Sequence, residues 1–146
     1  MRLQKLTGIL QACGSALLGA ASHFGKTILL DTLTGSVYTL PPATGSGGKI
    51  LVFEKLAATS NSHIVKVANA SDVMAGQIAL TIAAGGAVSG FATVAASDTV
   101  TLNRTTTGGA SNGGWLEFED VAPNLWSVHG IVNASAAPAT PFSAAV

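Results

Sequence analysis

The sequence SVYTLPPATGSGGKILVFE, residues 36–54, indicates the fold class most clearly. It contains two short runs of β-branched, aromatic and other apolar residues, at 36–40 and 49–54, separated by prolines and glycines that favour a turn. Similar runs recur on both sides of this stretch, at 27–30, 63–68, 77–82, 91–95, 99–103, 114–119 and 125–132. We therefore predict an all-β domain at residues 26–132, a β-sandwich or barrel of jelly-roll or β-tulip-like form.

The clearest hairpin lies near the C-terminus. Apolar and acidic residues alternate over 115–119, and residues 121–124 turn the chain into a second run at 125–129. Alternation predicts four core residues: Leu116, Phe118, Trp126 and Val128. Trp115 then lies on the opposite, charged face, where either a partner protein or a loop of its own chain must cover it.

The two ends of the chain lack the strand pattern. Leu3, Leu6 and Leu10 recur at intervals that would place them on one side of a helix, but interspersed glycines weaken a helix. We expect residues 1–25 to form an N-terminal arm or short helix that a neighbouring surface orders. Residues 133–146 contain two prolines and no periodicity, so we expect an extended tail in which Phe142 could act as an anchor.

Composition narrows the possible functions. The 146 residues include 7 Lys and Arg against 7 Asp and Glu, and only 10% of the chain is charged. The basic residues are scattered and form no stripe, so we expect no nucleic-acid partner. So few charges provide poorly for a solvated surface, and we expect much of this surface to contact protein. A single cysteine can form neither an internal disulfide nor a cysteine-based zinc site.

Residues 6–25 carry no charged side chain and raise the question of export or membrane insertion. Residues 10–13 resemble a lipoprotein cleavage box at Cys13, but the apolar run before them is shorter than an export segment needs. Polar residues and glycines make 6–25 a poor membrane span, and glycines likewise interrupt the uncharged stretch 73–97. We expect no membrane association.

No motif indicates catalysis. The glycine-rich segment 45–49 lacks the Walker spacing and precedes a strand, so we expect a hairpin turn there. The three histidines have no metal-ligand spacing, and no nucleophile elbow is present. Glu117 and Glu119 share one strand face and could form a carboxylate pair, although a solvated face is the simpler interpretation. Three aspartates sit beside turn residues and should cap local backbone donors: Asp31, Asp72 and Asp98. We expect no enzyme activity, cofactor or metal.

Several short stretches of the sequence resemble those of a known family. They are YTLPPATGSGG (38–48), NSHIVKVANASDVM (61–74), GGWLEFED (113–120), WSVHG (126–130) and ATPF (139–142). Together they resemble small virion proteins of tailed bacteriophages, most nearly the head decoration, or capsid cement, proteins. The resemblance covers about residues 31–146. It rests on short sequences of turns and strands, which are also typical of tail and fibre proteins.

This resemblance implies a structural protein on the outer capsid surface of a virion. Such proteins assemble as homotrimers and clamp neighbouring subunits of the major capsid protein, and the family implies no catalytic residues. We expect five residues to contribute to contacts between subunits: Leu3, Leu6, Leu10, Trp115 and Phe142. Two alternatives remain, a phage tail or fibre component and an exported bacterial β-domain that binds a ligand; a third class, a hydrolase using the glutamate pair, has no evident substrate.

Overall fold

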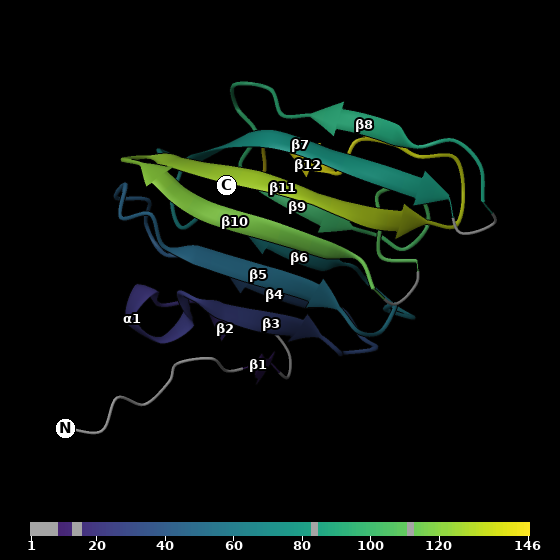
Figure 1. Cartoon of the computed structure of the whole chain (residues 1–146), viewed down its shortest axis with the longest axis horizontal. Coiled ribbons are helices and arrows are strands. Elements are labelled where there is room, and N and C mark those ends of the chain that lie inside the picture. Colours follow the sequence, from purple (N-terminus) through teal and green to yellow (C-terminus); the bar gives the residue numbers. More distant parts are fainter. Residues whose placement is uncertain (1–8, 13–15, 83–84, 111–112) are drawn as a thin grey trace.

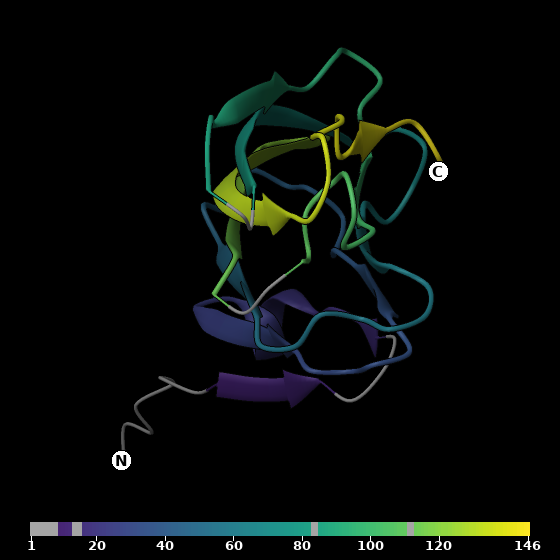
Figure 2. The same ribbon diagram turned by 90° about the vertical axis from the view of Figure 1, so that its right-hand side faces the viewer.

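Two β-sheets stacked face to face make up the fold. The computed structural model of the chain describes residues 9–12, 16–82, 85–110 and 113–146. Strands account for 48% of the chain and helix for 3%, which confirms the predicted all-β sandwich. In Figure 1 the larger sheet lies in front of the smaller one, and Figure 2 shows the molecule turned by 90°.

The larger sheet has seven strands in the order β1-β3-β5-β10-β11-β7-β8. Their bounds are β1 Ile9–Ala12, β3 Lys26–Leu30, β5 Lys49–Glu54, β7 Val73–Ile82, β8 Ser89–Ala92, β10 Trp115–Ala122 and β11 Leu125–Ala134. The smaller sheet has five strands in the order β12-β9-β6-β4-β2. Their bounds are β2 Ala16–Leu17, β4 Ser36–Thr39, β6 His63–Lys66, β9 Thr99–Leu102 and β12 Phe142–Ser143.

The first half of the chain winds as a coil between the sheets. Strands β1, β3 and β5 pair in parallel in the larger sheet, while β2, β4 and β6 pair in parallel in the smaller one. Successive strands from β1 to β6 therefore alternate between the two sheets. Because each strand buries one face in the shared interior, an alternating pattern recurs in both sheets.

The predicted C-terminal hairpin forms. Strands β10 and β11 are antiparallel and joined at Pro123 and Asn124, and Asn124 adopts a positive φ of 63° that closes the turn. The four residues predicted to face the core are all buried there: Leu116, Phe118, Trp126 and Val128. Strand β11 then pairs in parallel with β7, which extends the sheet beyond the hairpin.

The N-terminal segment joins both sheets. The helical alternative is wrong for Ile9–Ala12, which is strand β1; the helix α1 is the single turn Ala20–His23. Leu18 is buried, and the ring of Phe24 packs edge-on against Trp126 with 6.2 Å between ring centroids. Leu18 and Phe24 thus pack this segment against the core of the protein.

The C-terminal segment lies on the smaller sheet. Strand β12 pairs antiparallel with β9, and Phe142 is only 8% exposed within the core of its own chain. Asp98 holds the last residues, because its carboxylate accepts hydrogen bonds from the amides of Ala145 (2.8 Å) and Val146 (3.2 Å). Burial of Phe142 and these hydrogen bonds hold the C-terminal residues against the protein, whereas their sequence alone predicted only an extended tail.

Candidate functional site

The outer face of the larger sheet carries two rows of side chains that run across the strands. One row is mainly apolar and consists of Phe53, Trp115, Ile131, Ala79 and Gly90, paired in succession from β5 to β8; we call it the Trp115 row. Its three large side chains are each at least a third exposed. The other row, the polar row, consists of Glu117, His129 and Gln77, paired across β10, β11 and β7.

A shallow hollow of about 340 Å³ opens between the two rows. Its lining combines aromatic, aliphatic and polar groups: Gln77, Ile78, Ala79, Gly90, Trp115, His129, Gly130 and Ile131. Trp115 lies on the same face as Glu117 and Glu119, as alternation along the strand predicted, and it is 38% exposed. Alternation placed Trp115 with the glutamates, but it could not reveal Gln77, because β7 joins this face through parallel pairing with a strand far along the chain.

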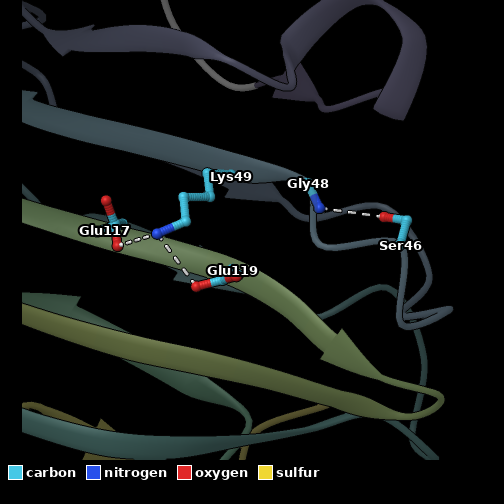
Figure 3. A network of polar contacts seen from close by, with 5 residues as sticks. All are labelled: Ser46, Gly48, Lys49, Glu117 and Glu119. Carbon is cyan, nitrogen blue, oxygen red and sulfur yellow. Dashed lines mark hydrogen bonds and ion pairs between the residues drawn. The ribbon is translucent and has the colours of Figure 1, made fainter.

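Glu117 and Glu119 both contact Lys49. Figure 3 shows the Lys49 ammonium between the two carboxylates, at 3.1 Å from Glu117 Oε1 and 3.2 Å from Glu119 Oε2. The hydrogen bonds from the ammonium to Glu117 and Glu119 raise the pKa of Lys49. This lysine occupies the space between the carboxylates, so the pair forms a surface ion-pair network of the kind that contributes little to stability.

The glycine-rich loop at 44–48 surrounds a carboxylate of its own chain. Asp120 is fully buried and accepts hydrogen bonds from the amides of Thr44, Gly45 and Ser46 and from the hydroxyls of Thr44 and Ser46, at 2.6–3.1 Å. Burial acts to raise the pKa of Asp120, but these hydrogen bonds outweigh it and lower the pKa to about 2. The loop therefore folds around Asp120 on β10, rather than forming only a local hairpin turn.

The aspartates expected to cap local turns also reach across the fold. Asp72 Oδ2 accepts hydrogen bonds from the side chain of Asn69 and from the distant amide of Ala43, both at 3.0 Å. Asp98 binds the two C-terminal amides already described. The expectation of purely local capping is wrong for both residues, because they bind backbone amides 29 or more residues away in sequence.

Two buried groups have chemistry that the sequence did not single out. Ser36 Oγ and His63 Nδ1 lie 2.7 Å apart, but both residues are buried and offer no access to a substrate. Burial lowers the pKa of His63. Glu54 is 1% exposed, and neither carboxylate oxygen has a hydrogen-bond partner among the described residues. Burial raises the pKa of Glu54 to about 8.

The residues expected at subunit contacts lie in different surroundings. Leu3 and Leu6 lie outside the described residues, as does Cys13, whose acylation would mark a lipoprotein. Leu10 belongs to β1, the end strand of the larger sheet, whereas Phe142 lies in the core. Of the five, Trp115 is the residue that the structure shows on an open face.

Within residues 9–12, 16–82, 85–110 and 113–146, no three histidine, cysteine or acidic side chains cluster to hold a metal ion. In the same ranges, no helix has both the length and the apolar character needed to span a membrane. No family model, curated protein or solved structure matches the chain significantly.

Proposed function

We propose that this chain is a structural virion protein that decorates and stabilises the outside of an icosahedral phage capsid. In this proposal, a homotrimer clamps neighbouring subunits of the major capsid protein. The observation that carries the proposal is an open strand edge at one end of the sandwich. Three further observations support it: the all-β fold, the low proportion of charged residues, and the resemblance of the short turn and strand sequences to those of decoration proteins.

The open edge is formed by the N-terminal strands. β1 ends the larger sheet and β2 ends the smaller one, so both sheets finish in N-terminal strands (Figure 2). Among the described residues, each of these strands pairs on one side only. Leu17 at this edge is 77% exposed.

An edge of this kind suits contact between protein chains. Free backbone N–H and C=O groups on an end strand are a template for a strand from another chain, and proteins usually protect such edges with charges or proline. Strands β1 and β2, with sequences ILQA and AL, contain neither. A neighbouring subunit that covers this edge would satisfy the backbone groups and bury Leu17.

The first test is the copy number of the chain in purified virions of the phage that encodes it, measured by quantitative mass spectrometry. A ratio near one relative to the major capsid protein supports the proposal. A few copies per particle would place the chain in the tail or a fibre, and its absence from particles would favour the exported binding domain.

The second test disrupts the edge without entering the core. Leu17→Lys should abolish the trimer in sedimentation and reduce capsid binding, because a lysine at the edge opposes strand addition. Val94→Lys is the matched control, since Val94 is similarly exposed, at 72%, and lies outside every strand. Unchanged assembly of Leu17→Lys would contradict the role of the edge. Deleting residues 1–25 is a poorer test, because it also removes the buried Leu18.

A further inference from the structure

The hollow beside Trp115 combines an aromatic surface with hydrogen-bonding groups, and we propose that it binds a neutral carbohydrate. The pyranose ring would stack on the indole of Trp115, and its hydroxyls would bond to the side chains of Gln77 and His129. This inference does not depend on the proposed virion role, because it concerns the sheet face and not the open edge.

The shape of the face matches the two sides of a sugar ring. A pyranose has C–H groups on its faces and hydroxyls around its rim, so it needs an apolar platform beside donors and acceptors. The electron-rich face of an indole attracts weakly positive C–H groups, and Ile131 extends the apolar side of the hollow. The polar row runs parallel to this platform, about 7 Å away, which is the spacing of residues two apart on a strand.

The chemistry of the lining favours this ligand class over others. An amide donates and accepts hydrogen bonds, and an imidazole has two ring nitrogens that can form them, so Gln77 and His129 suit hydroxyl groups. Glu117 lies directly opposite His129 and disfavours an anionic ligand, while Lys49 is engaged by Glu117 and Glu119. A wholly apolar ligand would leave the polar row without partners.

The hollow is kept open by small residues. Ala79 and Gly90 continue the Trp115 row beyond Ile131, where large side chains would fill the space. A Cβ built on Gly90 meets no atom within 4 Å, and the backbone there is not in the left-handed region. The volume of about 340 Å³ lies at the lower end of the range for small-molecule sites.

A second hollow, of about 420 Å³, lies over the smaller sheet and is lined by residues 34–37, 61, 62 and 64. That lining contains no aromatic or ionisable side chain, so it offers neither a stacking platform nor the same hydrogen-bonding set. The Trp115 hollow is therefore the better candidate for sugar recognition.

The test is a titration of the full chain with methyl glycosides of glucose, galactose, mannose and N-acetylglucosamine, followed by amide NMR shifts and tryptophan fluorescence. Fluorescence is informative because the chain has two tryptophans and the other, Trp126, is buried. At least one glycoside should give saturable shifts at the hollow, with a dissociation constant on the order of 1 mM, since an open site buries little ligand surface.

Three variants distinguish specific binding from a general surface effect. Trp115→Ala should weaken binding by about tenfold or more, because the stacking platform is lost. Gly90→Val should block binding by filling the hollow while it suits the strand. Phe53→Ala is the matched control, since it truncates another exposed aromatic of the same row outside the hollow, and it should leave binding within about twofold of the original value.

Two results would overturn the proposal. One is the absence of saturable shifts with every glycoside at up to about 50 mM, far above the expected constant. The other is binding that Trp115→Ala and Gly90→Val leave unchanged. Tighter binding of glucuronate than of glucose would overturn the assignment to a neutral sugar. A positive titration together with absence from virions would retain the sugar site and reject the virion role.

Discussion

Glu54 makes the stability of this protein depend on pH. Its side chain points into the sandwich at the end of β5, where it is 1% exposed and its oxygens find no hydrogen-bond donor among the described residues. Gly109 and Gly114 make room for it, because a Cβ at these positions would lie 2.9 Å from Oε1 and 2.7 Å from Oε2, respectively. Burial without a partner disfavours the charged carboxylate, which raises the pKa to about 8.

The direction and size of this pH dependence follow from the difference between the pKa of Glu54 in the folded chain and its pKa in the unfolded chain. The unfolded chain ionises Glu54 near its ordinary pKa of 4.5, whereas the folded chain keeps it protonated up to about pH 8. The contribution of Glu54 to the free energy of unfolding is therefore most favourable below pH 4.5, and it declines as the pH rises to about 8. At about 1.4 kcal/mol per pKa unit, the loss approaches about 5 kcal/mol at most.

Glu54→Gln removes this titration while keeping the shape of the side chain. The free energy of unfolding, measured by urea denaturation at intervals from pH 4.5 to 9, should fall with pH in the original protein and much less in the variant. By pH 8.5 the variant should be more stable by several kcal/mol, on the order of 3–5. All ionisable groups other than Glu54 are the same in both proteins, so their contributions cancel in the difference between them.

Glu119→Gln is the control, because Glu119 is an acid on the surface ion-pair network and should change stability by less than about 1 kcal/mol at any pH. If Glu54→Gln differed from the original protein by a constant amount between pH 4.5 and 9, the carboxyl would not titrate as its burial requires, and the reasoning would be wrong.

Three further predictions test other contacts. Asp120→Asn should lower the free energy of unfolding at pH 7 by about 2–4 kcal/mol, because charge-assisted hydrogen bonds are lost. Since the folded pKa of about 2 lies below the ordinary 3.8, this difference should shrink as pH falls toward 2, and an undiminished difference in acid denaturation would contradict the assignment. Phe142→Ala should cost about 3 kcal/mol and reduce hydrogen-exchange protection in β9 and β12; unchanged protection would show that the tail contributes little. Gly130→Ala should destabilise the β10–β11 pair by about 3 kcal/mol or more in thermal unfolding, because its Cβ would collide with the carbonyl of Trp115. Gly90→Ala, where the space is open, should stay within about 0.5 kcal/mol, and equal effects at the two glycines would refute the steric argument.

Alternation of apolar and polar residues predicted those features of the fold that depend only on strands adjacent in sequence. The hairpin of β10 and β11 was predictable because its turn and both of its apolar faces lie within one short stretch. The same alternation contained an unused signal, since Asp120 has the parity of Leu116 and Phe118, and Glu54 has the parity of Ile50 and Val52. Extending the core face of each strand by one position would have placed both acids inside.

Longer-range pairing was not predictable from these patterns. Nothing in the sequence of β1 to β6 indicates that successive strands enter opposite sheets, because a strand buried on one face has the same pattern in either sheet. The N-terminal leucines were ambiguous for a related reason. Their spacing suits one side of a helix, but pairing of Ile9–Ala12 with β3 determines the observed strand. The polar row likewise depends on the parallel pairing of β11 with β7.

The placement of the acids changes what the formal net charge of zero means for partners. Four acids are buried residues, namely Glu54, Asp72, Asp98 and Asp120, and the side chain of Asp31 is only 6% exposed. The two remaining acids, Glu117 and Glu119, contact one lysine. With Glu54 protonated at pH 7, the formal count becomes six acids against seven basic residues, and four of those six acids lie inside the fold. Long-range attraction depends on the net charge, so this small positive excess should make the protein approach an acidic partner slightly faster at low salt than its formal neutrality suggests.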